Sequence, residues 1–277
     1  MSLKNNNCRI EKTFRNLKDA NQSALITFIT AGDPDFNISK KILFNLPNSG
    51  ADIIEIGVPF SDPMADGPII QKSYKRALNN GINLDKVLSL VQLFRKKNKD
   101  TPIILMGYYN PIYQKGLKLF FQQAEKSGVD GILIVDLPPE NDNEIQKYIK
   151  DSDIKFIRLA TPTTDRRRLS KILKISSGFL YYVSITGITG TNLGNLANVK
   201  SIYKKFRSFS KIPIVVGFGI NTPDKAKNVS KYADGVVIGS SIVNEVDKTI
   251  GKKSNINEDV LKLVKRFSKA IKTARKH

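Results

Sequence analysis

The feature that most constrains the fold is a repeated alternation of short apolar runs with helical stretches. The runs are rich in β-branched residues and nearly continuous in apolar character, as parallel strands buried on both faces are. They cover residues 24–32, 52–58, 102–108, 131–138, 155–162, 178–185, 212–220 and 233–239. Such an alternation allows an open doubly wound sheet or a closed barrel. Eight evenly spaced units favour the barrel.

We therefore expect an α/β fold, a single (β/α)8 TIM barrel with an extra N-terminal helix over residues 10–20. No linker, low-complexity block or change in composition divides the 277 residues, so residues 1–277 are expected to form a single domain. In such a barrel the carboxyl ends of all strands meet on one rim, and residues just after each strand converge on one site.

The second of these strands leads into a loop that carries several acids. In residues 51–71, ADIIEIGVPFSDPMADGPIIQ, Glu55 shares a strand face with Ile53, because side chains alternate along a strand. A carboxylate among isoleucines is costly to bury unless it is neutral or paired. Glu55 is therefore either half of a structural salt bridge or a functional acid with a raised pKa. The loop adds Asp62 and Asp66.

Two scarce residue types limit the chemistry and the compartment. The one histidine is His277, the last residue, which excludes Ser-His-Asp and Cys-His catalysis and histidine-based zinc sites. The acid–base groups of an enzyme are then Asp, Glu, Tyr or Lys, and we expect no metal. The one cysteine, Cys8, rules out an internal disulfide and is typical of a reducing cytoplasm.

The remaining compositional features bear on partners. No apolar run reaches the roughly 18–20 residues of a membrane span, and the N-terminus lacks the apolar core of a signal peptide, so we expect a cytoplasmic protein without a membrane partner. The net charge of +20 fits either a nucleic-acid surface or an enzyme with an anionic substrate. The chain has no aromatic-and-arginine ladder that stacks bases, so we expect a small anionic molecule and no nucleic acid.

Glycine-rich turns after the last three strands indicate a phosphate site. A Gly-Phe-Gly turn ends at Gly219, and Gly239 and Ser240 open a short helix after the eighth strand. Glycines let backbone N–H groups approach an anion, and a helix N-terminus supplies free donors. The segment 186–191, TGITGT, would form a third wall. Three such turns together predict a phosphorylated ligand, although each alone is ordinary loop chemistry.

The other half of the rim is apolar. The residues that the barrel would gather there are Phe28, Ile70, Met106, Tyr108, Leu133 and Phe218. Each alone could be barrel core, but together they would form a flat apolar pocket beside Glu55 and Asp66. A phosphate site at one end and two acids with an apolar slot at the other describe an aromatic molecule with a phosphorylated tail.

Seven motifs make the sequence similar to the tryptophan synthase alpha chain family from about residue 14 to residue 274. They are FITAGDPD (28–35), IEIGVPFSDPMADGPIIQ (54–71), MGYYNP (106–111), VDLPPE (135–140), YYVSITGITGT (181–191), VVGFGI (215–220) and VVIGSSI (236–242). The resemblance implies retro-aldol cleavage of 1-C-(indol-3-yl)glycerol 3-phosphate to indole and D-glyceraldehyde 3-phosphate, a lyase step of tryptophan biosynthesis that needs no cofactor in this chain.

The resemblance also implies a partner. Members of the family pass indole through a tunnel to a beta chain that carries pyridoxal phosphate and makes L-tryptophan, in an α2β2 heterotetramer. Asp62, Pro63 and the loop 186–198 match regions that face this partner.

Residue roles follow from the same resemblance. It implies that Glu55 is the general acid/base, that Asp66 contacts the indole N–H and stabilises its developing positive charge, and that Tyr181 lies beside the reacting glycerol carbons. The implied phosphate-binding residues are Gly190, Gly219, Gly239 and Ser240, and the implied indole pocket consists of Phe28, Met106 and Phe218.

The residues themselves indicate that Glu55 and Asp66 have different roles. A carboxyl group desolvated on the second strand should have a raised pKa, so Glu55 can be protonated near neutral pH. Asp66, in a more polar loop, should stay ionised. Closure of loops 60–70 and 186–198 would exclude water.

Two alternatives to this lyase function stay open at this point. One is a sugar-phosphate epimerase or isomerase on the same barrel, and the other is a basic binding protein that has lost the chemistry.

Overall fold

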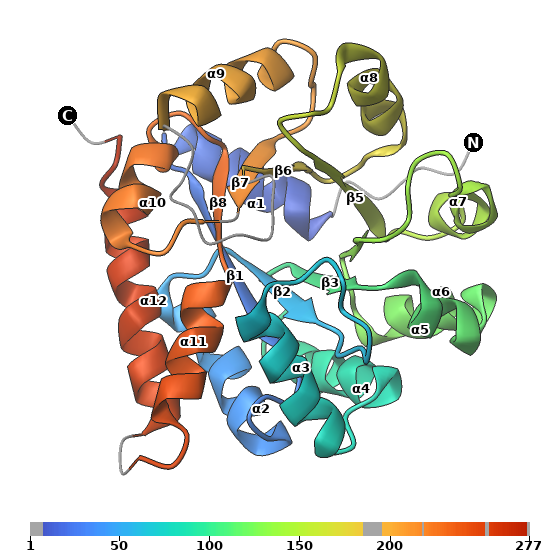
Figure 1. Ribbon diagram of the computed structural model, residues 1–277, viewed down its shortest axis with the longest axis vertical. Helices are drawn as coiled ribbons and strands as arrows, with labels where there is room; N and C mark the ends of the chain where they lie inside the picture. Colours follow the sequence, from blue (N-terminus) through green and yellow to red (C-terminus); the bar gives the residue numbers. More distant parts are fainter. Residues whose placement is uncertain (1–7, 185–195, 218, 253–254, 276–277) are drawn as a thin grey trace.

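The strands form one closed, all-parallel barrel in the order β1 to β8 (Figure 1). The computed structural model describes residues 8–184, 196–217, 219–252 and 255–275. The strands are β1 (Ala24–Thr30), β2 (Ile53–Gly57), β3 (Ile103–Gly107), β4 (Gly131–Ile134), β5 (Lys155–Ala160), β6 (Leu180–Val183), β7 (Ile214–Gly217) and β8 (Gly235–Ile238). The expected eight-stranded barrel is confirmed.

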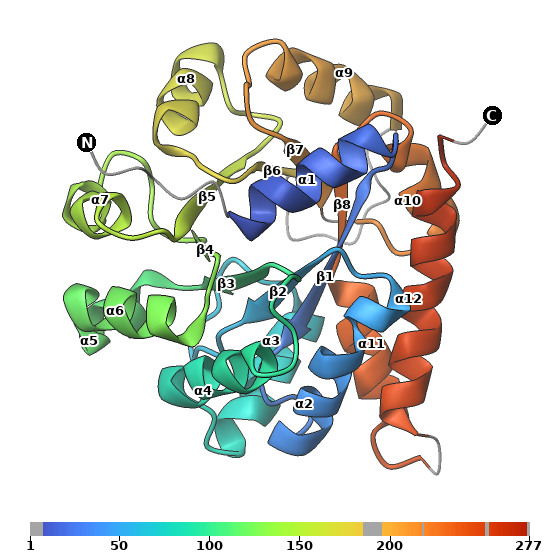
Figure 2. The same ribbon diagram turned by 180° about the vertical axis from the view of Figure 1, so that it is seen from behind.

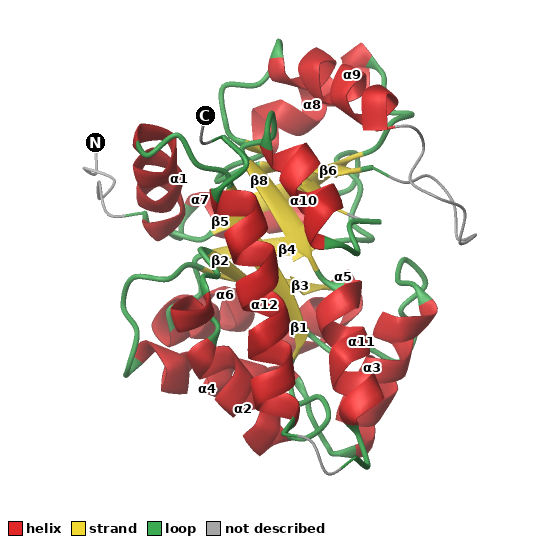
Figure 3. Cartoon of the chain, turned by 90° about the vertical axis from the view of Figure 1, so that its left-hand side faces the viewer, coloured by secondary structure: helices red, strands yellow, loops and turns green. Residues whose placement is uncertain are grey.

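Helices surround the strands, as the side view in Figure 3 shows. They are α1 (Arg9–Asp19), α2 (Phe36–Asn45), the 3-10 helix η1 (Pro47–Ser49), α3 (Pro68–Asn79), α4 (Leu84–Arg95), α5 (Tyr109–Lys115), α6 (Leu117–Ser127), α7 (Asn143–Lys150), α8 (Arg166–Ile175), α9 (Leu196–Arg207), α10 (Pro223–Ser230), α11 (Ser240–Thr249) and α12 (Ile256–Lys272). None of those in the described part of the chain combines the length and apolar character that a membrane crossing needs.

Side chains alternate along each strand between the barrel interior and the helices. In β2, Ile53 belongs to the inner apolar cluster, whereas Ile54 and Ile56 belong to the outer one. Glu55 lies on the inner face with Ile53, as expected, and its strand register pairs it with Phe28 of β1 and Ile104 of β3. The barrel therefore places this carboxyl group in its interior.

The expected N-terminal helix is present as α1 and covers one end of the barrel. In Figure 2 it lies in front of the strands. Its apolar face, Ile10, Phe14 and Leu17, packs into the inner cluster, and the rings of Phe14 and Phe179 meet edge to face at 5.7 Å. Helix α1 thus completes the barrel core at the end where the strands begin.

Prolines set the bounds of two helices. Helix α2 ends at Asn45 and gives way to η1, because Pro47 has no N–H to continue it. Helix α3 begins at Pro68, since proline is favoured in the first turn. Helix α5 was not expected, because it is short and buries only Ile112, which gives no apolar periodicity.

At the end covered by α1, one buried carboxylate connects three parts of the chain. Asp130, just before β4, accepts hydrogen bonds from Arg9 (2.8 Å) in α1, Arg95 (2.5 Å) in α4 and the backbone N–H of Ile103 (2.7 Å) in β3. Its side chain is only 6% exposed. Removing one partner of such a buried pair leaves the other charge uncompensated.

We expect Asp130→Ala to lower the free energy of unfolding by about 3 kcal/mol, since Arg9 and Arg95 lose their shared anion. Urea denaturation monitored by circular dichroism measures the change. Asp100→Ala is the control, because Asp100 forms an exposed pair with Lys12 at 3.9 Å and should contribute less than about 1 kcal/mol. Equal effects of the two substitutions would contradict the assignment of Asp130 as a structural anchor.

Candidate active site

A cavity of about 360 Å³ lies at the rim where the strands end. It brings together residues that are far apart in the sequence, from β1, β2, β3, β6 and β8 and from the loops and helices that follow β2, β7 and β8. Its walls consist of Phe28, Glu55, Asp66, Gly67, Ile69, Ile70, Met106, Tyr181, Gly219, Ile220, Asn221, Val237, Gly239, Ser240, Ser241 and Asn244. Of the residues to which the family resemblance assigns a catalytic, phosphate-binding or indole-binding role, every one that the structure describes lines this cavity.

Glu55 is the most deeply buried acid of the cavity. The residue is 1% exposed, and neither carboxyl oxygen has a hydrogen-bond partner among the described residues. Burial, with a smaller contribution from the charge of Asp66, raises the pKa of Glu55 to about 8. The interpretation of Glu55 as half of a structural salt bridge is therefore wrong, because no Lys or Arg of the described ranges pairs with it. A carboxyl group in this state is protonated at neutral pH and can donate a proton.

Asp66 approaches the same cavity from the loop between β2 and α3. Its carboxylate accepts a hydrogen bond of 2.6 Å from the hydroxyl group of Tyr108, and the residue is 7% exposed. Asp66 thus has a more polar environment than Glu55, as expected, but it is more buried than a loop position suggests: burial raises the pKa of Asp66, and the hydrogen bond from Tyr108 opposes that shift. The two acids are close enough that the charge of Asp66 contributes to the raised pKa of Glu55.

Two glycines make room for the aromatic walls. A Cβ atom at Gly57 would lie 2.5 Å from the ring of Phe28, and one at Gly217 would lie 2.3 Å from the hydroxyl oxygen of Tyr181. Neither distance is possible for a real side chain, so both positions need glycine for the rings to face the cavity. Burial raises the pKa of Tyr181 well above its usual value, which keeps its hydroxyl group protonated.

The end of the cavity at β7 and β8 has backbone donors of the kind expected for an anion site. Helix α11 begins at Ser240, and its N-cap, Gly239, has no side chain to satisfy the first backbone N–H groups of the helix. Gly219 has a positive φ of 72°, a conformation that glycine adopts readily. These features suit an anion bound by backbone amides.

Not every prediction falls within this cavity. Gly190 and Phe218 lie outside the described residues, as does most of the loop 186–198. Tyr108 and Leu133, expected in the apolar pocket, are buried beside it and do not line it. Two polar residues of the wall, Asn221 and Asn244, were not predicted. Asn244 follows Ser240 by one helical turn, so the helical period of α11 could have identified it.

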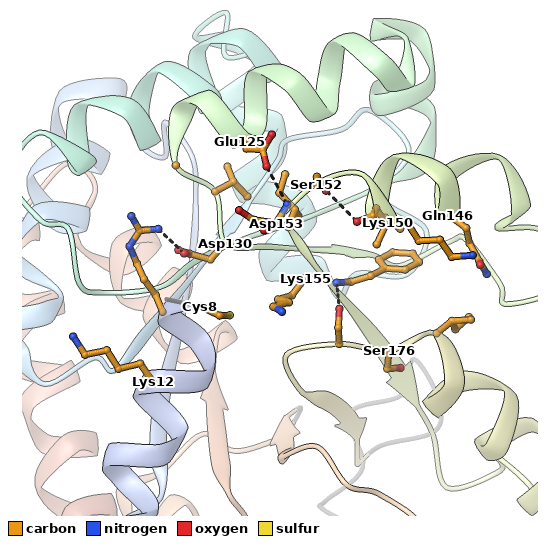
Figure 4. A pocket seen from close by; sticks show the side chains of 18 of the residues that line it. Cys8, Lys12, Glu125, Asp130, Gln146, Lys150, Ser152, Asp153, Lys155 and Ser176 are labelled. Carbon is orange, nitrogen blue, oxygen red and sulfur yellow. Dashed lines mark hydrogen bonds and ion pairs between the residues drawn. The ribbon is translucent and has the colours of Figure 1, made fainter. Parts of the chain in front are cut away.

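A larger cavity of about 790 Å³ lies at the opposite end of the barrel (Figure 4). It is lined by Cys8 and Lys12 of α1 and by residues at the starts of strands, including Asp130 and Lys155. Two ion pairs lie within its wall, Arg9 with Asp130 at 2.8 Å and Lys12 with Asp100 at 3.9 Å. None of the predicted site residues in the described ranges borders it, so cavity size does not identify the active site here.

The described ranges contain no group of three or more His, Cys, Asp or Glu side chains that could hold a metal ion. The fold and the cavity at the strand ends together define an enzyme of the (β/α)8-barrel class in which carboxyl groups are available for acid–base chemistry.

Comparison with known proteins identifies the family. The family model of the tryptophan synthase alpha chain matches residues 14–272. A structure of tryptophan synthase subunit alpha from Legionella pneumophila str. Paris is 40% identical, with a TM-score of 0.90 over 95% of this chain and 98% of that chain. This chain belongs to the tryptophan synthase alpha chain family, and it is a lyase of tryptophan biosynthesis with the function of the alpha subunit.

More distant structures share the same fold over nearly the whole chain. A protein from Aquifex aeolicus VF5 is 36% identical, with a TM-score of 0.87 over 95% of this chain and 98% of that one. The tryptophan synthase of Mycobacterium tuberculosis is 27% identical, with a TM-score of 0.87 and the same two coverages. The sugar-phosphate epimerase and the binding protein considered above are therefore not the families to which this chain belongs.

Proposed function

We propose that the cavity at the strand ends cleaves 1-C-(indol-3-yl)glycerol 3-phosphate to indole and D-glyceraldehyde 3-phosphate. The observation that carries this proposal is the presence of Glu55 and Asp66, two buried carboxyl groups in different environments, in one cavity with a glycine-rich anion site. The reaction needs proton transfer at two substrate atoms and stabilisation of a transient positive charge.

Glu55 is assigned as the general acid/base. With a pKa of about 8, it is protonated at neutral pH and can add its proton to C3 of the indole ring, which places a positive charge on the ring. The bond between C3 and the glycerol carbon then breaks, and its electron pair returns to the ring. The hydroxyl group of that carbon loses its proton to the Glu55 carboxylate as the aldehyde forms. Glu55 thus ends protonated, as it began.

Asp66 is assigned to the charge on the ring, and the remaining walls to substrate orientation. A carboxylate beside the indole N–H would stabilise the positive charge that C3 protonation creates. Gly219, Gly239, Ser240 and, from the sequence, Gly190 would bind the phosphate. Phe28, Met106 and Phe218 would enclose the indole ring, with Tyr181 beside the glycerol carbons.

We further propose a tryptophan synthase beta chain as the partner, in an α2β2 heterotetramer in the cytoplasm. The loop after β2 supports this assignment, because Met64 is 78% exposed there and Asp62 is also exposed. Ile69, five residues further on, is also an exposed apolar residue, and grouped apolar side chains on a surface are typical of a contact with another protein. No cofactor is assigned to this chain, and pyridoxal phosphate is expected in the beta chain.

Indole release by the purified chain, with and without a beta chain, tests the proposal. We expect the isolated wild-type chain to release indole from the substrate. Asp66→Asn should lower kcat/KM about 10²–10³-fold, because the neutral amide cannot stabilise the charge on the ring.

The matched control is Asp62→Asn, which removes an exposed carboxylate from the same loop. It should leave indole release by the isolated chain unchanged, since Asp62 does not line the cavity. Full activity of Asp66→Asn would remove Asp66 from the mechanism, and absence of indole release by the wild-type chain in both assays would refute the proposed reaction.

A further inference from the structure

Tyr108 lies directly after β3, at the N-cap of α5, and its side chain connects to the loop that carries Asp66. The residue is 2% exposed and does not line the active-site cavity, but its hydroxyl group contacts the loop that carries Asp66. An effect of this hydroxyl group on catalysis therefore passes through its neighbours.

The hydroxyl group of Tyr108 makes two hydrogen bonds to consecutive residues. It donates to Oδ2 of Asp66 at 2.6 Å and accepts from the backbone N–H of Ala65 at 3.0 Å. The donation to Asp66 is the one hydrogen bond to that carboxylate within the described residues. A phenol bound in both directions is fixed in orientation, and it fixes the carboxylate in turn.

The ring of Tyr108 holds the other end of the same loop. It stacks on Phe60, with ring centroids 5.1 Å apart and an interplanar angle of 30°. Phe60 follows β2 by three residues, and Asp66 precedes α3 by two. One side chain therefore holds the loop near both of its ends, by an apolar contact at the start and by polar contacts at the finish.

We propose that Tyr108 is a positioning residue, which orients the Asp66 carboxylate toward the cavity and favours its ionised form. The proposal rests on the proposed role of Asp66 in the reaction. A hydrogen bond donated to a carboxylate stabilises the charged form, whereas burial destabilises it. Tyr108 is thus the group that offsets the effect of burial on Asp66.

Tyr108→Phe tests this role, because it removes the hydroxyl group and keeps the ring that stacks on Phe60. We expect kcat for indole release to fall about tenfold, as the loss of one hydrogen bond to a charged group predicts. KM should change little, because the anion site lies on other strands. The acid limb of the kcat–pH profile should move to higher pH, because the pKa of Asp66 rises without its donor.

Two controls separate positioning from stability. Tyr182→Phe removes a buried hydroxyl group that has no hydrogen-bond partner among the described residues, and it should leave kcat and the acid limb unchanged. Phe60→Leu removes the stacking partner and keeps the Tyr108 hydroxyl group. It should lower the melting temperature and leave the acid limb in place.

A double substitution distinguishes this proposal from the assignment of Asp66. In the Asp66→Asn background, Tyr108→Phe should cost almost nothing further, because both changes remove one function. If Tyr108→Phe lowers the melting temperature and leaves kcat and the acid limb unchanged, or if its effect multiplies with that of Asp66→Asn, the positioning role is overturned. If Asp66→Asn alone has full activity, the proposed function of Asp66 fails first.

Discussion

Glu55→Gln is expected to release indole about 10²–10⁴-fold more slowly than the wild-type chain, the range that one general acid/base contributes. Gln has nearly the same shape as Glu and fits the same buried position on β2. It cannot give a proton to C3 of indole or take one from the glycerol hydroxyl group. A steady-state assay of indole release at saturating substrate measures the effect on kcat.

The matched control is Glu125→Gln, at the opposite end of the barrel, where the carboxyl group accepts a hydrogen bond from the backbone N–H of Asp153. Gln can accept that bond, and the cavity at the strand ends is untouched, so activity should equal that of the wild type. Because Glu55 has no cation partner in the part of the chain that the structure describes, its replacement should not unfold the protein, and circular dichroism should show a native spectrum. A Glu55→Gln chain with wild-type kcat would exclude Glu55 as the proton donor.

The same burial should make the stability of the protein fall as pH rises. The folded chain keeps the Glu55 proton up to about pH 8, whereas the unfolded chain loses it near pH 4.5. Between these values the unfolded state binds fewer protons, so the free energy of unfolding falls with rising pH. The slope approaches roughly 1.4 kcal/mol per pH unit, and the total between pH 5 and pH 8 is roughly 4 kcal/mol.

Urea unfolding of the wild-type and Glu55→Gln chains at several pH values isolates this contribution. Other groups titrate in both proteins, so the difference between their free energies of unfolding reports Glu55 alone. We expect the free energy of unfolding of Glu55→Gln, relative to that of the wild type, to rise steadily up to about pH 8 and then to stay constant. The dependence should weaken in the Asp66→Asn background, because the charge of Asp66 contributes to the raised pKa. If the difference between the two free energies of unfolding is the same at all pH values, Glu55 is not neutral in the folded chain.

The fold could be predicted because each strand carries its own signal. Eight apolar runs with helical sequence between them predict a barrel before any contact is known. Because the carboxyl ends of the strands meet on one rim, Glu55 and Asp66 are then expected to lie close together. Strand alternation alone places Glu55 inside, since Ile54 and Ile56 take the outer face. That residues 1–277 form a single domain stays a prediction, as do the roles of Gly190 and Phe218.

What the sequence could not reveal depends on contacts between distant residues. The state of Asp66 depends on the hydroxyl group of Tyr108, 42 residues further along the chain. No local pattern reports that bond or the burial of Asp66. Asn221 likewise lines the cavity together with residues of strands distant in the sequence, such as Phe28 of β1.

Helix α1 closes one end of the barrel. Ile10, Phe14 and Leu17 fill the end where the strands begin, so the active-site cavity opens toward the rim at which the strands end. In the proposed reaction, substrate and product would therefore use the end of the barrel at which the strands end. The proposed beta chain would dock at this same end, where the loop after β2 exposes Asp62 and Met64.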